Sequence, residues 1–211
     1  MHEAIQAKVH KETPEGTYFL VLAPNKSLTD EVRKLASGGE LHGELRIDDG
    51  REITSDQRKK AYATLCDIAD HLGYAPEELK ELMKYRFIAA TGEKYFSLSD
   101  CCVTTARRFI SHLIDFALEW GVPLTDSPVN RTDDISAAVY ASIKHRRCVL
   151  CGAEGDIHHW DAIGMGHDRR TYDDSHLRKI CLCRAHHGEA HQIGRMVFEE
   201  KYHVYGIVYR E

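Results

Sequence analysis

Two short motifs of cysteine and histidine constrain the last third of this chain more than any other feature. Cys148 and Cys151 are separated by two residues, and a second pair with the same spacing, Cys183 and His186, begins 32 residues after Cys151. Two such pairs can bring four ligands to one tetrahedral zinc ion. Cys181 is an alternative ligand, but its longer spacing from His186 favours Cys183. A segment of about 65 residues is small enough to need such a metal for its stability.

The distribution of cysteine and histidine favours metal binding over disulfides. Four of the seven cysteines lie at or beyond position 148, and nine of the fourteen histidines lie from His145 onward. The N-terminal residues lack the apolar core of a signal peptide, so a cytoplasmic location is expected, where clustered cysteines more often bind metal than pair with each other. No apolar run approaches the roughly 20 residues that span a bilayer, so no membrane partner is expected.

The net charge of −5 argues mildly against a nucleic-acid partner, because neutralisation of phosphates dominates DNA affinity. The cations are unevenly placed, however. Lys144, Arg146 and Arg147 directly precede the first cysteine pair and further arginines follow it, while the acidic surplus lies upstream. Charge alone therefore decides neither for nor against DNA.

Hydrophobic periodicity and turn residues predict an α+β protein. Strands are expected at residues 4–10, 17–23 and 41–47, a short helix at 28–36, and longer helices at about 54–72, from Pro76 through Phe87, and at about 99–120. Residues 121–131 hold two of the five prolines and mark a boundary. The predicted organisation is an N-terminal domain at 1–125 with a small sheet and helices, a linker and connecting helix at 126–147, and a metal-binding domain at 148–211.

A further set of histidines lies between and after the two metal-ligand pairs. The side chains of neighbouring His158 and His159 would point to opposite faces of a strand, whereas His187 and His191 would share one face of a helix. One histidine of the adjacent pair can therefore ligate a metal while the other faces a substrate. A divalent ion and an imidazole base are the parts that phosphodiester hydrolysis needs. These residues alone leave open a second zinc site without chemistry.

The order of these motifs resembles the zinc-bound form of the HNH nuclease motif, whose fold is a ββα unit around a metal. The matching stretches run from Cys148 to Cys151, from Asp156 to Trp160, and from Ser175 to His191. The resemblance implies a structural Zn²⁺ and a catalytic divalent metal, which is Mg²⁺, Mn²⁺ or Zn²⁺. The implied ligands of the structural zinc are Cys148, Cys151, Cys183 and His186, and those of the catalytic metal are His158, His187 and His191.

The same resemblance implies that His159 is the general base that activates water. His176 falls at the middle position, where the family usually has an asparagine that braces the loop carrying the base. The chain departs from the family there, although an imidazole can also donate to a backbone carbonyl. Arg169, Arg170 and Arg184 are the expected DNA contacts, since guanidinium groups suit phosphate.

The stretches from Ile53 to Phe87 and from Phe96 to Leu124 resemble the NinB (Orf) recombination proteins of bacteriophages, which bind single-stranded DNA. The resemblance implies a phage-encoded protein in the cytoplasm of a bacterial host, a homodimer, single-stranded or branched DNA as partner, and phage or host recombination proteins as further partners. Phosphate contacts are expected from Arg58, Lys59, Lys60, Lys84 and Arg86.

The sequence as a whole predicts a metal-dependent DNA endonuclease of the HNH type that acts in phage recombination or replication. The alternative is a catalytically inactive, zinc-containing protein that binds single-stranded DNA and mediates recombination. Such a protein would share the zinc ligands but would have no use for His159.

Overall fold

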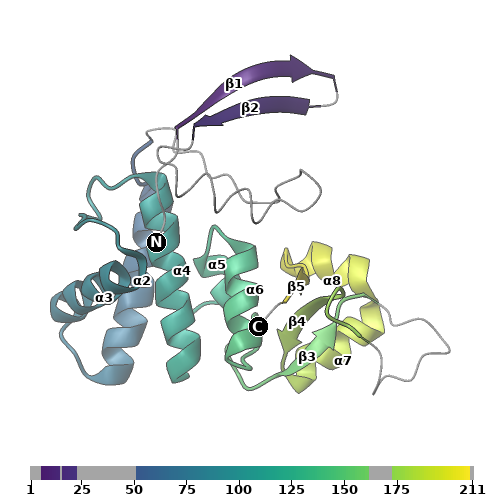
Figure 1. The fold of residues 1–211 in the computed structure, drawn as a ribbon. Helices are drawn as coiled ribbons and strands as arrows, with labels where there is room; N and C mark the ends of the chain where they lie inside the picture. Colours follow the sequence, from purple (N-terminus) through teal and green to yellow (C-terminus); the bar gives the residue numbers. More distant parts are fainter. Residues whose placement is uncertain (1–5, 15, 23–50, 162–172, 210–211) are drawn as a thin grey trace. The chain divides into compact units, whose positions relative to one another are not determined.

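A computed structural model describes residues 6–14, 16–22, 51–161 and 173–209 of the chain (Figure 1). The chain divides into two units, Met1–Ile47 and Asp48–Glu211. The helix expected at 28–36, the strand expected at 41–47, and Arg169 and Arg170 all lie outside the described residues. Among the described residues, no helix is both long and apolar enough to cross a membrane.

The first unit contains an antiparallel hairpin of strands β1 (Gln6–Thr13) and β2 (Gly16–Leu22). Gln6 pairs with Leu22 and Thr13 pairs with Gly16, and the register shifts between Val9 and Lys11. The two strands predicted on either side of the turn are confirmed, each with bounds a few residues different from those predicted.

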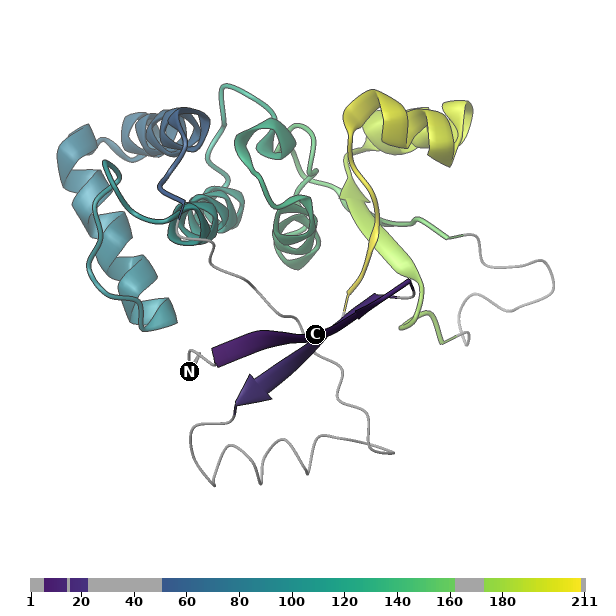
Figure 2. The same ribbon diagram turned by 90° about the horizontal axis from the view of Figure 1, so that it is seen from above.

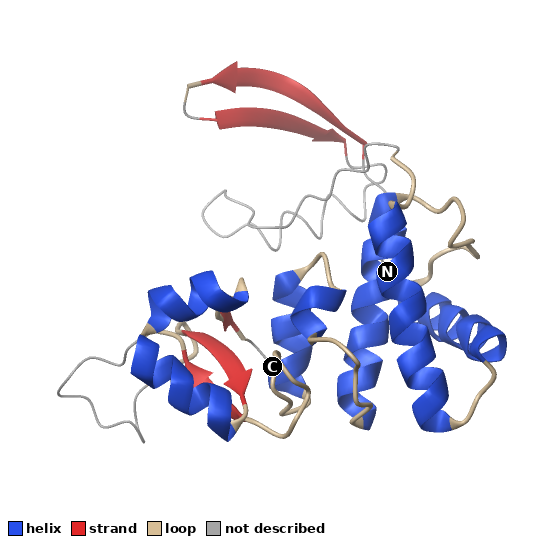
Figure 3. Ribbon diagram, turned by 180° about the vertical axis from the view of Figure 1, so that it is seen from behind, coloured by secondary structure: helices blue, strands red, loops and turns tan. Residues whose placement is uncertain are grey.

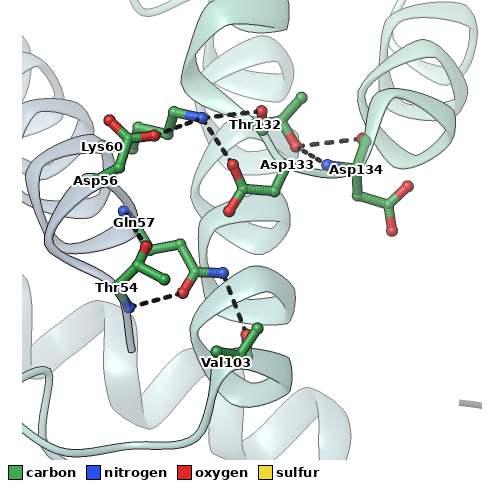
Figure 4. Close-up of polar contacts among 8 residues, drawn as sticks. All are labelled: Thr54, Asp56, Gln57, Lys60, Val103, Thr132, Asp133 and Asp134. Atoms are coloured by element: carbon green, nitrogen blue, oxygen red, sulfur yellow. Dashed lines mark hydrogen bonds and ion pairs between the residues drawn. The ribbon is translucent and has the colours of Figure 1, made fainter. Parts of the chain in front are cut away.

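The second unit begins with three helices, α2 (Ser55–Leu72), α3 (Pro76–Thr91) and α4 (Val103–Trp120). A capping box fixes the start of α2, because Thr54 and Gln57 each accept a hydrogen bond from the other's backbone N–H at 3.1 Å (Figure 4). The third helix starts at Val103, later than the predicted Ser99, because the chain turns at 97–100 and the Cys101 N–H donates to the Ser97 carbonyl.

The core of these three helices is apolar and largely sealed from solvent. Phe87 makes edge-to-face contacts with Phe96 and Phe109. The centroid of the Phe87 ring is 5.6 Å from the centroid of each of these rings. The other fully buried large side chains of this core are Leu65, Ile68, Leu79, Met83, Ile110, Leu113, Ile114 and Leu118. This part of the chain therefore has a hydrophobic core that does not depend on metal.

Two helices connect this core to the C-terminal residues: α5 (Pro128–Arg131) and α6 (Ile135–Lys144). The connection is held by charge, since the Lys60 ammonium on α2 lies 2.7 Å from the Asp133 carboxylate and 3.4 Å from the Thr132 carbonyl (Figure 4). Helix α6 then packs against both α4 and the C-terminal sheet. The connecting helix predicted within 126–147 is present as α6.

The C-terminal part is a three-stranded antiparallel sheet with two helices (Figures 2 and 3). Its strands, in the order β3-β4-β5, are β3 (Asp156–His159), β4 (Arg178–Leu182) and β5 (Ile207–Val208), and its helices are α7 (Arg184–Ile193) and α8 (Arg195–Tyr202). Helix α7 packs against α8 and β4. Ile180, Leu182, Phe198 and Val204 are buried between these elements. The predicted α+β class is therefore confirmed.

Candidate active site and metal centre

The four predicted zinc ligands lie together in the structure. Cys148 and Cys151 lie in the turn between α6 and β3, while Cys183 caps the start of α7 and His186 lies in its first turn. The Nδ1 atom of His186 is 3.4 Å from the Cys148 Sγ and 3.2 Å from the Cys183 Sγ, and the Cys151 and Cys183 sulfurs are 3.7 Å apart. All four ligand atoms lie within 4.8 Å of one another. Three thiols and one imidazole at this spacing fit a tetrahedral zinc ion, and we call them the four-ligand cluster.

Backbone hydrogen bonds fix the turn that carries the first two cysteines. The Cys148 N–H donates to the Ala153 carbonyl at 2.7 Å, and the Gly152 N–H donates to the Cys148 carbonyl at 2.8 Å. Gly152 has a φ of 70°, a conformation that suits glycine. The Val149 N–H donates to the Cys181 carbonyl at 3.1 Å and so ties the turn to β4.

Cys181, the alternative ligand, lies outside the four-ligand cluster. Its side chain is fully buried in the hydrophobic core of the C-terminal part. A Cβ atom added to Gly155 would come within 3.1 Å of the Cys181 sulfur and 2.8 Å of the Leu182 carbonyl oxygen. Cys181 is thus a packed core thiol, and glycine at position 155 is required by this close approach.

The three predicted ligands of the catalytic metal form a second group, which we call the histidine cluster. The ring of His158 on β3 contacts the rings of His187 and His191 on α7, with centroid separations of 4.6 and 4.9 Å. The two α7 rings stack at 5.0 Å, as expected for residues one helical turn apart. One nitrogen from each residue lies within 4.8 Å of the others. The four-residue spacing on α7 and the strand that faces it bring the three imidazoles together.

Burial favours the neutral form of two rings in the histidine cluster, those of His158 and His187. Burial, followed by the neighbouring His187 and His191, lowers the pKa of His158 to about 4. Burial likewise lowers the pKa of His187. The rings of His158 and His187 therefore carry unprotonated nitrogens at neutral pH, which is the form that ligates a metal.

His159 makes its hydrogen bond with a residue that the sequence did not indicate. The His159 Nε2 lies 2.6 Å from an Asp174 carboxylate oxygen, and the other oxygen of Asp174 accepts from the Lys179 ammonium at 2.7 Å. The hydrogen bond from Lys179 has the largest effect in lowering the pKa of Asp174, and the hydrogen bond with His159 has the next largest. The Asp174 carboxylate is therefore ionised at neutral pH. An ionised carboxylate only accepts hydrogen bonds. The Nε2 atom of His159 therefore carries the hydrogen, and in the neutral ring Nδ1 keeps its lone pair.

A second residue of this loop, His176, occupies the middle position of the motif. His176, expected to brace the loop that carries the base, is exposed two residues beyond Asp174. Asp174 directly follows another aspartate, and no spacing rule distinguishes it from a solvated loop carboxylate. Its role becomes visible only when β3 and β4 pair, because His159 then lies opposite Lys179, the second partner of Asp174.

A pocket of about 540 Å³ joins these groups. All three residues of the histidine cluster line it, together with His159, Asp161 and Arg195. Arg178 binds Asp161 through two side-chain nitrogens, at 2.6 and 3.0 Å, and holds the pKa of that carboxyl at about 2. Arg195 also contacts Asp161, at 3.1 Å. Arg184, the predicted DNA contact that falls within the described residues, is exposed at the start of α7.

This arrangement defines an α+β protein with two candidate metal sites, in which a histidine hydrogen-bonded to a carboxylate shares a pocket with three converging imidazoles. A family model described as "Putative HNHc nuclease" matches residues 27–210. The chain therefore belongs to this family of HNH nucleases. Searches of curated proteins and of solved structures found no match.

Proposed function

We propose that the protein is a metal-dependent DNA endonuclease with His159 as its general base. The observation that carries this proposal is the His159–Asp174 hydrogen bond of 2.6 Å at the edge of a pocket that the histidine cluster also lines. A purely structural metal site has no use for an oriented imidazole beside it. Membership of the HNH nuclease family supports the same reading.

His158, His187 and His191 would hold the catalytic divalent ion. When bound, that ion would hold the scissile phosphate and stabilise the leaving oxygen. The residues of the chain supply the proton transfer: His159 would accept a proton from the attacking water at Nδ1, while Asp174 holds the ring through Nε2. Asp174 would also stabilise the imidazolium that forms, and Lys179 keeps Asp174 ionised.

The four-ligand cluster would hold a structural zinc ion that positions the catalytic residues. His186, one of its members, is followed immediately by His187 of the histidine cluster, both within α7. A zinc ion bound by Cys183 and His186 would fix the first turn of α7, and therefore the ring of His187. Loss of that zinc should then affect both stability and the second metal site.

Replacing Asp174 with asparagine should lower kcat by about tenfold to 100-fold, the usual cost of losing a group that orients a metal-site histidine. KM should change little, because Asp174 acts through His159 and not on the substrate. Glutamate at this position should restore part of kcat, since a carboxylate would again accept from Nε2. The measurement is steady-state cleavage of a DNA oligonucleotide by the three proteins. Equal kcat values for the wild type and Asp174→Asn, with His176→Ala impaired instead, would assign the bracing role to His176.

The histidine cluster should prefer transition metals over Mg²⁺. Imidazole nitrogen suits zinc, copper, iron and nickel, whereas Mg²⁺ prefers oxygen ligands. Cleavage by zinc-loaded protein should therefore saturate at a Ni²⁺ or Co²⁺ concentration at least about tenfold below that required for Mg²⁺. A titration of each metal against the cleavage rate measures this. Saturation by Mg²⁺ at the lowest concentration would contradict nitrogen ligation of the catalytic ion.

For the biological setting, we propose DNA recombination or replication of a bacteriophage, on the resemblance of the helices in the second unit to NinB proteins. Branched DNA, whose arms are duplex, a homodimer and recombination partners belong to the same proposal. Three of the five expected phosphate contacts are engaged elsewhere: Lys84 is 4% exposed and pairs with Glu81, Lys60 pairs with Asp133, and Arg58 donates to the Leu98 and Ser99 carbonyls. DNA binding by the helical part would therefore use the exposed Lys59 and Arg86 or other residues.

A further inference from the structure

The first turn of α8 forms one edge of the pocket. Arg195, the first residue of α8, lines the pocket, and its side chain is 47% exposed. Met196 follows it with 79% exposure, the highest value among the large apolar side chains that the structure describes. Val197, the next residue, is 53% exposed, so two neighbouring apolar side chains adjoin a pocket-lining cation at the start of α8.

Arg195 makes one hydrogen bond at this edge. Asp161 contributes one negative charge that Arg178 and Arg195 share, and Glu199 lies four residues after Arg195 on α8. Arg178 takes the two-point contact, whereas the hydrogen bond between Arg195 and Asp161 uses a single Nη1 atom of a guanidinium that has five N–H donors. Asp161 therefore orients the Arg195 guanidinium but uses only one of its N–H donors. The other donors can bind an anion in the pocket.

We propose that the first turn of α8 is the edge of the pocket that binds duplex DNA, with Arg195 on a backbone phosphate and Met196 in the groove beside it. The inference rests on the proposed nuclease function, because a phosphate must enter the same pocket for cleavage. An oriented guanidinium matches phosphate geometry. A flexible apolar side chain such as methionine is one that DNA-binding proteins insert between base steps.

The lining of the pocket favours a duplex over a single strand. Proteins that bind single-stranded DNA stack its bases on exposed aromatic rings. Trp160, the tryptophan of the pocket lining, is 5% exposed and packs against Phe198, with ring centroids 6.2 Å apart. It is therefore covered, and the exposed apolar groups described at this edge are Met196 and Val197.

The test of Arg195 measures DNA binding in the zinc-loaded full chain with Mn²⁺, in a His159→Ala background that prevents cleavage. Arg195→Gln is compared with Lys201→Gln, a matched loss of one charge on the same helix, since Lys201 is 53% exposed and pairs with Glu189. Arg195→Gln should weaken binding to a 20-base-pair duplex by about tenfold and reduce its salt slope by about 1. Lys201→Gln should remain within about twofold of the background. Equal binding by these two variants would overturn the phosphate contact.

The test of Met196 compares the same duplex with one of its single strands. Met196→Ser should weaken duplex binding by about fivefold and leave single-strand binding unchanged, while Val208→Ser, at an exposed site on β5, should change neither. Unchanged duplex binding, or an equal loss for both DNAs, would overturn the groove contact. These binding results do not depend on cleavage, so failure of the wild type to cut DNA would refute the proposed function separately.

Discussion

Replacing Cys183 with serine is expected to release the structural zinc and to unfold the C-terminal part of the chain. The four-ligand cluster joins the turn at 148–151 to the start of α7, segments that are distant in sequence. Structural zinc contributes about 10–16 kcal/mol of apparent binding free energy, which is as large as the whole stability of a typical domain. The effect is measured by zinc content, thermal unfolding and limited proteolysis. The protease should cut the variant first at sites beyond residue 145.

Two other cysteines provide controls for this result. Cys66 is exposed on α2, so Cys66→Ser should keep one equivalent of structural zinc and the wild-type melting temperature. Cys181→Ala should keep the zinc but lower the melting temperature, because it leaves a small cavity in a packed core. Loss of zinc from Cys181→Ala, together with retention by Cys183→Ser, would exchange the roles of the two residues.

Replacing His159 with alanine is expected to lower the DNA cleavage rate by about 10²-fold to 10⁴-fold, the usual contribution of a positioned general base. The stability should change little, because the His159 side chain is 36% exposed and Asp174 keeps its ion pair with Lys179. Zinc content and melting temperature should therefore match those of the wild type. Single-turnover cleavage of a labelled duplex measures the chemical step directly.

The control for this prediction is His71→Ala, which removes an exposed imidazole at the end of α2 and should leave cleavage unchanged. A rate for His159→Ala within about threefold of the wild type would exclude His159 as the base. A large loss of bound zinc in the same variant would instead indicate a structural role for His159.

The helices of the second unit were predictable because their signals are local. Apolar spacing, the Thr54–Gln57 capping box and the glycines after α2 and α4 each lie within a few residues of what they determine. The start of α4 was less predictable, since the turn at Ser97 competes with helix formation over 99–102. Local sequence cannot decide between the turn and an earlier helix start. The outcome depends on a contact between distant segments, in which the Ile53 N–H donates to the Cys101 carbonyl.

In the candidate site, the residues predicted from spacing are those that the structure brings together. Two residues between ligands, or four along a helix, translate directly into proximity. Asp174 and Arg195 had no such signal. Asp174 reaches His159 through the pairing of β3 with β4, and Arg195 reaches Asp161 across 34 positions. Contacts of this kind depend on tertiary structure, and a single sequence carries no local pattern for them.

The most direct test of the proposed function is cleavage of supercoiled plasmid by the zinc-loaded wild-type protein with added Mn²⁺, run beside His159→Ala. We predict that the wild type produces nicked and linear plasmid, that removal of the added divalent ion stops the reaction, and that His159→Ala produces neither form at equal zinc content. Absence of metal-dependent cleavage of duplex, single-stranded and branched DNA by the wild type would contradict the account. That result would favour a zinc-containing DNA-binding protein without catalysis.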